Sequence, residues 1–393
     1  MRTRATARGS RAVLVPALVV AAVAGCTGAT DPAAERSASP TSEGPASGPS
    51  GLEAEPSELD VSTVASGLDA PWSIAFHGDT PLLSERDTGR ILELAEDGAA
   101  REIGAIAEAA PRGEGGLLGI AVREDYLYAY FTAPDENRIQ RYPLTGEPGA
   151  LGLGEPEPLL GGADGLDGFD APDAASYHNG GRIVFGPDGM LYATVGDAGD
   201  AASAQDREDL NGTILRLTPD GGVPEDNPFE GSPVYSYGHR NPQGLAWDEE
   251  GTLYSSEFGQ NTWDELNVIE PGGNYGWPEV EGVGGDDRFI DPVQQWSPAD
   301  ASPSGMAIVG GGLWIANLRG ERLREVPLEQ LPQEDETQED LDAATEHLVG
   351  EHGRLRDAAR APDGSLWVLT NNTDGRGTPG PDDDRLLRVE RTP

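Results

Sequence analysis

Short apolar segments recur along the chain, each followed by a turn rich in Gly or Asp. After the turn comes a leucine, usually with an aromatic neighbour, at the start of a second apolar segment. Such alternating segments bounded by Gly and Asp are typical of antiparallel strands joined by tight turns. Three clear copies and three looser ones occur, at residues 183–192, 245–254, 361–368, 74–83, 120–128 and 306–314.

A second pattern follows every copy and consists of a turn and one more alternating strand. The leucine marks from residue 127 to residue 366 are roughly 53–64 residues apart, which suits one four-stranded sheet with its loops. Six copies predict an all-β fold, a six-bladed β-propeller of four-stranded antiparallel blades. A two-sheet sandwich would not explain six copies of a paired pattern. The second pattern lies at residues 89–94, 137–142, 212–217, 264–269, 321–326 and 384–389.

The N-terminal segment has a different pattern. Four arginines precede an apolar run over residues 12–24, which is too short to span a bilayer and has the flanking charge of an export signal. Small residues then precede Cys26, as in a bacterial lipobox. We expect a lipoprotein signal peptide over residues 1–25 and a lipid on Cys26 that anchors the protein at the extracellular face of the bacterial cell membrane. The alternative is an incidental thiol in a signal peptide that is cleaved elsewhere.

Cys26 is the only cysteine, so a disulfide framework is impossible. Residues 26–57 are rich in Ser, Pro, Gly and Ala and nearly lack large apolar residues, which predicts a flexible tether. The propeller is expected over residues 58–393. The formal net charge is −42 and all 27 basic residues are arginines. Such acidity repels phosphates and argues against a nucleic acid partner, while arginines that cluster in such a chain suggest an anionic ligand.

His178 stands two residues before Gly180, the first of a double glycine that precedes a predicted strand. A neutral imidazole can accept a hydroxyl proton near physiological pH, as the oxidation of an alcohol requires. Gly180 and Gly181 would let the backbone approach a flat ligand closely. An ordinary hydrogen-bonding histidine is the alternative.

Arginines recur in two further motifs. Arg240 and Asn241 combine a rigid fork suited to carboxylates with an amide that both donates and accepts. Arg354 and Arg356 are two residues apart, so on a strand both side chains point to the same face. A pair of surface arginines that balances acidic neighbours is the alternative.

Residues 257–265 and 274–278 are rich in oxygen ligands. Carboxylates and free backbone carbonyls suit Ca²⁺, which takes six to eight oxygens. The segment has no cluster of Cys and His, so zinc is not expected. A solvated acidic turn is the alternative.

Together these motifs resemble the soluble quinoprotein glucose/sorbosone dehydrogenase family, and most of all its aldose sugar dehydrogenase branch. The resemblance runs from about residue 68 to residue 389, with four motifs in the family's order. It implies oxidation of an aldose sugar at the anomeric carbon. The implied cofactors are pyrroloquinoline quinone (PQQ) and Ca²⁺, and the implied partners are the sugar and an external electron acceptor, a quinone or a redox protein.

The resemblance also implies roles for individual residues. His178 would be the general base that takes the anomeric hydroxyl proton while hydride passes to the quinone, and Asp197 would lie beside the substrate. By the same resemblance, PQQ would be held by Arg240, Asn241, Arg354 and Arg356. The carbonyls of Gly259 and Gln260 would bind the calcium that touches PQQ. Glu265 and the Tyr275 carbonyl would bind a second, structural calcium.

Two positions depart from the family's pattern. Glu114 stands where well-known members carry a glutamine that contacts PQQ, and Arg319 replaces a lysine that contacts it. Arginine keeps the positive charge but is bulkier and planar.

Two other functions fit a propeller of this kind. A calcium-dependent sugar-lactone or ester hydrolase would use an axial Ca²⁺ but would not need four converging arginines. A surface module that binds carbohydrate or protein without a cofactor would take up no PQQ.

Overall fold

The computed structural model describes residues 59–162, 165–166, 168–331 and 344–392. The predicted signal peptide, the lipid on Cys26 and the tether over residues 26–57 lie outside this part of the chain. The regular secondary structure of the described residues is almost entirely β-strand, with two short 3-10 helices at Ser203–Gln205 and Leu328–Gln330. Within them, no helix has the length and apolar character that crossing a membrane requires.

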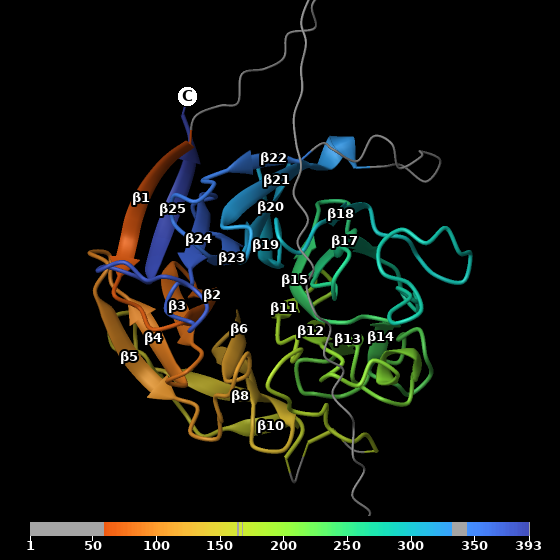
Figure 1. Cartoon of the computed structure of the whole chain (residues 1–393). Helices are drawn as coiled ribbons and strands as arrows, with labels where there is room; N and C mark the ends of the chain where they lie inside the picture. Colours follow the sequence, from red (N-terminus) through yellow and green to blue (C-terminus); the bar gives the residue numbers. More distant parts are fainter. Residues whose placement is uncertain (1–58, 163–164, 167, 332–343, 393) are drawn as a thin grey trace, which may run out of the picture. The chain divides into compact units, whose positions relative to one another are not determined.

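The strands form six antiparallel sheets, which are the blades of a β-propeller (Figure 1). The prediction of six four-stranded blades is confirmed, with one short extra strand on blade 2. Blade 1 comprises β2 (Pro71–His77), β3 (Thr80–Glu85), β4 (Arg90–Leu94) and β5 (Ala100–Ala105). Blade 2 comprises β6 (Leu117–Arg123), β7 (Tyr126–Thr132), β8 (Asn137–Thr145), the extra β9 (Gly152–Leu153) and β10 (Glu157–Leu160). Blade 3 comprises β11 (Ile183–Phe185), β12 (Leu191–Val195), β13 (Thr213–Leu217) and β14 (Val234–Tyr237).

In blades 1 to 5 the repeated pattern overlaps the first two strands, whereas in blade 6 it overlaps only the second strand. In all six blades the second pattern falls on the third strand. Blade 4 comprises β15 (Pro242–Trp247), β16 (Leu253–Glu257), β17 (Asp264–Ile269) and β18 (Gln294–Trp296). Blade 5 comprises β19 (Pro303–Val309), β20 (Gly312–Asn317), β21 (Arg322–Pro327) and β22 (Thr345–His347). Blade 6 comprises β23 (Leu355–Arg360), β24 (Leu366–Thr370), β25 (Arg385–Arg391) and β1 (Leu59–Ser66).

The last blade is completed by the first strand. β1 pairs antiparallel with β25, from Leu59 opposite Arg391 to Ser66 opposite Arg385. The sequence patterns did not predict this pairing. It covers an edge of β25 that would otherwise be open and ties both ends of the propeller into one sheet.

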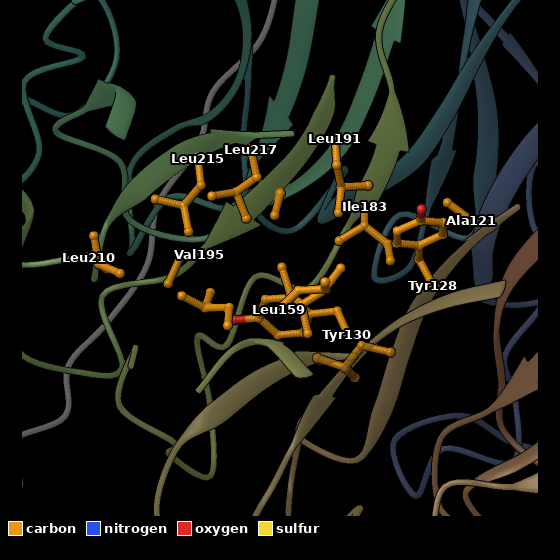
Figure 2. Close-up of a cluster of buried hydrophobic side chains, with 14 of the residues drawn as sticks. Ala121, Tyr128, Tyr130, Leu159, Ile183, Leu191, Val195, Leu210, Leu215 and Leu217 are labelled. Carbon is orange, nitrogen blue, oxygen red and sulfur yellow. The ribbon is translucent and has the colours of Figure 1, made fainter. Parts of the chain in front are cut away.

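Among the described residues the apolar core is divided into six clusters, five of them made by two neighbouring blades and one by blades 2 and 3 together with Trp72 of blade 1. Strand β7 shows how alternation produces this arrangement. Tyr128 and Tyr130 face blade 3, where they join Ile183 and Leu191 (Figure 2). Leu127, Ala129 and Phe131 point the other way and join the cluster shared with blade 1. Both faces of the strand are therefore buried, and each large apolar side chain removed from water contributes about 1.5–3 kcal/mol.

Candidate active site

A cavity of about 420 Å³ lies where segments from all six blades meet. Loops before the first strands and between the second and third strands supply most of its wall. Eight of the residues singled out in the sequence line it: Glu114, His178, Arg240, Gly259, Gln260, Arg319, Arg354 and Arg356. The predicted arginines and histidine therefore belong to one site.

His178 is held through both its backbone and its ring. Its φ of 58° is in the left-handed region, which is uncommon for a side chain that is not glycine. The backbone N–H of His178 donates to Glu114 Oε2 at 3.0 Å, and its carbonyl accepts from the N–H of Ala198 at 3.1 Å. The ring Nδ1 lies 2.7 Å from Asp197 Oδ1. These contacts fix the ring at the cavity wall.

Asp197 determines which ring nitrogen of His178 carries the proton. It is buried, and its carboxylate also accepts from the Gly199 N–H at 2.8 Å and from Trp277 Nε1 at 2.9 Å. Burial alone would raise the pKa of Asp197, but the hydrogen bonds from His178, Gly199 and Trp277 outweigh it and lower that pKa. An ionised carboxylate only accepts, so Nδ1 is the donor, and a neutral ring carries its lone pair on Nε2.

The double glycine after His178 is required by packing within the protein. Both glycines have positive φ, 60° at Gly180 and 102° at Gly181. A Cβ on Gly180 would lie 2.6 Å from the Thr194 carbonyl oxygen, and one on Gly181 would lie 2.5 Å from Leu118 Cδ1. The atoms that exclude a side chain here belong to the protein itself.

Arg240 and Asn241 lie at the start of blade 4. Asn241 is fully buried, and its Oδ1 accepts from the Gly180 N–H at 3.0 Å while its Nδ2 has no hydrogen-bond partner in the described residues. Arg240 Nη1 donates to the Phe258 carbonyl at 3.1 Å and to the Gly259 carbonyl at 2.5 Å. Its Nε is buried and has no hydrogen-bond partner among the residues that the structure describes. Arg240 Nε and Asn241 Nδ2 could therefore each donate a hydrogen bond to a ligand in the cavity.

Arg354 and Arg356 both line the cavity, but Arg354 directly precedes β23 and Arg356 lies where the pairing of β23 with β24 shifts register. Arg354 Nη2 pairs with Asp374 at 3.0 Å, and its Nε is buried without a partner in the described residues. Arg356 Nη1 donates to Gln243 Oε1 at 2.8 Å. Burial, together with the nearby Arg354 guanidinium, lowers the pKa of Arg356 to about 9 despite the attraction of Asp374. Arginine stays protonated in proteins. The lowered pKa therefore indicates that Arg356 is a buried cation with too little negative charge around it.

Glu114 and Arg319 differ sharply in their surroundings. Glu114 is mostly buried and accepts hydrogen bonds from His178 and from Arg376. Arg319 is exposed at the cavity and makes no hydrogen bond or ion pair with the rest of the described chain. Its guanidinium is therefore available to a ligand.

Glu265 and Tyr275 line a second, much smaller cavity of about 10 Å³, together with Glu257 and Glu281. A space of that size holds about one water or one ion. Burial, together with the charge of Glu257, raises the pKa of Glu265 to about 8. In the described part of the chain, no three His, Cys, Asp or Glu side chains form a closed ligand group. A cation here would therefore need backbone carbonyls as well.

The loop with Gly259 and Gln260 is shaped by Glu281. One oxygen of that carboxylate accepts from four successive backbone N–H groups, those of residues 260–263, at 2.7–3.3 Å. Gln260 is exposed, and the Gly259 carbonyl faces Arg240. Access of a cation to that carbonyl would require Arg240 to shift.

Several lining or supporting residues were missed in the sequence. Trp72 lies beneath the guanidinium groups of Arg182 and Arg356, at 4.3 and 5.6 Å from its ring centroid. Gln243 stands in the same motif as Arg240, so that motif carried a signal for it. Arg376 lies in the loop after β24, and nothing in its local pattern distinguished it from a surface arginine.

The fold and this cationic axial cavity define a propeller that binds an anionic ligand beside a histidine–aspartate pair. The profile of the family described as Glucose / Sorbosone dehydrogenase matches residues 68–387, and the chain belongs to that family.

Three relatives show how far the likeness extends. A solved structure, the PQQ-bound form of the aldose sugar dehydrogenase of Streptomyces coelicolor, is 48% identical, with a TM-score of 0.77 over 86% of this chain and 99% of that one. The aldose sugar dehydrogenase YliI of Escherichia coli is 30% identical over 83% of this chain and 94% of its own. Quinoprotein glucose dehydrogenase B of Acinetobacter calcoaceticus is 32% identical over 66% of this chain, and the match spans 61% of that protein.

Proposed function

We propose that this protein oxidises aldose sugars at the anomeric carbon, with PQQ bound in the axial cavity next to Ca²⁺. The observation that carries the proposal is the convergence of five arginines from blades 4, 5 and 6 on one cavity, in a chain of net charge −42. PQQ carries three carboxylates, and arginine is the side chain best suited to pair with them. The PQQ-bound relative supports this choice.

The residues present fit such a ligand. Arg240 Nε, Asn241 Nδ2 and Arg354 Nε are buried donors without partners in the described residues. Buried donors are normally hydrogen-bonded, so these three suit a molecule with several acceptors. Arg356, a buried cation short of counter-charge, and the exposed Arg319 would complete the contacts.

His178 would act as the general base. Its Nε2 carries the lone pair and is the ring atom free to take the anomeric hydroxyl proton. Asp197 would hold the ring in this tautomer and stabilise the imidazolium that forms. When bound, PQQ would supply the acceptor for the hydride that leaves the anomeric carbon. A quinone or redox protein from outside would then accept the electrons.

Calcium is proposed at two places. At the cavity, the carbonyls of Gly259 and Gln260 would face the ion beside the cofactor. In the small cavity, Glu265 and the Tyr275 carbonyl would bind a structural ion, with Glu257 and Glu281 nearby. Hard cations prefer such oxygen ligands, and an ion there would offset the repulsion between buried carboxylates.

We also propose that the mature protein is lipid-anchored through Cys26 at the extracellular face of the cell membrane. The lipobox-like sequence and the single cysteine support this location. Cys26→Ser should release the protein or leave it unprocessed. A wild-type protein that is wholly soluble with an unmodified Cys26 would exclude the anchor.

The activity is tested by reconstitution. Apo-protein is mixed with aldose and a redox dye, with PQQ and Ca²⁺ supplied separately and together. We expect dye reduction only when both are present, with the sugar lactone as product. Hydrolysis of a sugar lactone without PQQ would favour the hydrolase. A protein that binds sugar but reduces no dye under any of these conditions would favour the cofactor-free module.

A further inference from the structure

Glu114 is a carboxylate placed among the arginines of the axial cavity. Its side chain is 17% exposed, and it lines the cavity with Arg240 and Arg356. Its negative charge is felt by both guanidinium groups. Opposite charges attract strongly in a partly buried site. An unrestrained carboxylate at this position would pair with the arginines that the proposed function assigns to PQQ.

Both oxygens of Glu114 are already engaged elsewhere. Oε1 accepts from Arg376 Nη1 at 2.8 Å, and Oε2 accepts from the His178 backbone N–H at 3.0 Å. The backbone of Glu114 is fixed as well, because its N–H donates to the Ser176 carbonyl at 2.9 Å. Burial alone would raise the pKa of Glu114, but these hydrogen bonds and the charge of Arg376 lower it. Glu114 therefore remains ionised while Arg376 and the His178 backbone hold its two oxygens.

Arg376 reaches Glu114 from a different blade. It lies in the loop after β24 of blade 6, whereas Glu114 precedes β6 of blade 2. Asp374 anchors this loop, since its carboxylate accepts from the Arg376 backbone N–H at 2.8 Å and from Arg354 at 3.0 Å. The Arg376 side chain is 55% exposed, unlike the buried Arg354 and Arg356. It sits at the rim of the cavity with Glu114 as its partner.

We propose that Arg376 is a positioning residue that holds Glu114 on the His178 backbone and keeps this carboxylate from competing with an anionic cofactor. The inference rests on the proposed function for the identity of that cofactor. Its consequence is a specific coupling. Loss of Arg376 weakens the affinity for the cofactor when residue 114 is a carboxylate. The affinity falls far less when residue 114 is neutral. A glutamine at 114 can still accept from the His178 N–H but has no charge to pair with arginine.

The coupling is measured by titrating PQQ into apo-protein with Ca²⁺ present. Four proteins form the cycle: wild type, Arg376→Met, Glu114→Gln and the double variant. In the Glu114 background, Arg376→Met should raise the Kd about tenfold, the size expected for losing one charged hydrogen bond. In the Glu114→Gln background the same change should have an effect of about twofold or less. Arg288→Met removes an exposed arginine paired with Asp286 and Glu279 and controls for net charge.

Equal losses in both backgrounds would mean that Arg376 contacts the cofactor directly, and no loss in either would mean that Glu114 needs no restraint. Either result overturns the proposal. Hydrogen exchange of residues 175–180 in the apo-protein gives a reading without PQQ. Arg376→Met should speed exchange at the His178 amide, and the double variant should restore protection. If wild type takes up no PQQ, the proposed function fails, and unchanged exchange in Arg376→Met would separately overturn the role of Arg376.

Discussion

The proposed chemistry of this site depends on how the side chain of His178 is restrained. Its left-handed backbone is uncommon, and conformations of this kind persist only where the surroundings determine them. Glu114 holds its N–H, Ala198 holds its carbonyl, and Asp197 holds its ring. Asp197 is itself oriented by Trp277. The ring is thereby set in one tautomer and one orientation before any substrate arrives.

Replacing His178 by asparagine tests its role as a base. The asparagine amide can still donate to Asp197, so no buried carboxylate is left unpartnered. We expect turnover of aldoses to fall by roughly 10²–10⁴-fold, the usual contribution of a positioned general base, while PQQ affinity and melting temperature stay close to wild type. Steady-state kinetics and a PQQ titration measure both. Near wild-type turnover would remove His178 from the mechanism and make Asp197 the next candidate.

At the scale of elements, the two sequence patterns located the first three strands of blades 1 to 5 and the second and third strands of blade 6, but no fourth strand. The inner strands alternate between two buried faces, which produces a clear apolar period, as in Leu191–Val195. The outer strands are half exposed, as in Ala100–Ala105, and give little apolar signal. The pairing of β1 with β25 joins opposite ends of the propeller, and no local pattern can encode such a contact.

The same distinction explains which site residues were predicted. Arg354 directly precedes β23 and Arg356 lies within it, so their spacing of two residues was a local signal that both could face one side. His178 and Arg240 lie in compact motifs. Arg376, by contrast, acquires its role only through a partner 262 residues away in the chain. Trp72 is placed below the arginines by closure of the ring, which sequence spacing does not show.

Removal of β1 tests whether strand closure stabilises the propeller. Deleting the chain through Ser66 exposes the edge of β25 and withdraws Leu59, Val61 and Ala65 from the clusters they join. We expect the melting temperature to fall by about 5 °C or more, because each large apolar side chain contributes about 1.5–3 kcal/mol. Calorimetry against a matched truncation through residue 57 isolates the strand. Equal melting temperatures for both truncations would show that closure by β1 is dispensable.

At the scale of the whole molecule, charge is distributed unevenly. The chain carries 69 acidic residues against 27 arginines, yet five arginines face one axial cavity. A concave site with an excess of positive side chains concentrates anions. The acidic exterior thus repels anions in general, while the axis offers them one place to bind. Closure of six blades around that axis is what brings these distant arginines together.

Calcium removal tests the small cavity lined by Glu257, Glu265 and Glu281. An ion bound only by the folded protein stabilises it by mass action. Exhaustive chelation should therefore lower the melting temperature by about 5 °C or more. The matched control is Glu265→Gln, which should melt lower than wild type with calcium present and respond little to chelation. If chelation leaves the wild-type melting temperature unchanged, the structural calcium site is wrong.

We propose that the axial arginines hold PQQ. Calorimetric titration of apo-protein with PQQ, in the presence of Ca²⁺, measures the affinity and the stoichiometry of this binding. We expect one PQQ per chain. Arg356→Met should weaken binding by about a hundredfold or more, since removing one partner of a buried charge pair costs about 3–5 kcal/mol. Arg288→Met should bind like wild type, and melting curves should show that both variants fold. If the wild type takes up no PQQ, or if Arg356→Met binds PQQ as tightly as the wild type, the axial arginines do not hold PQQ.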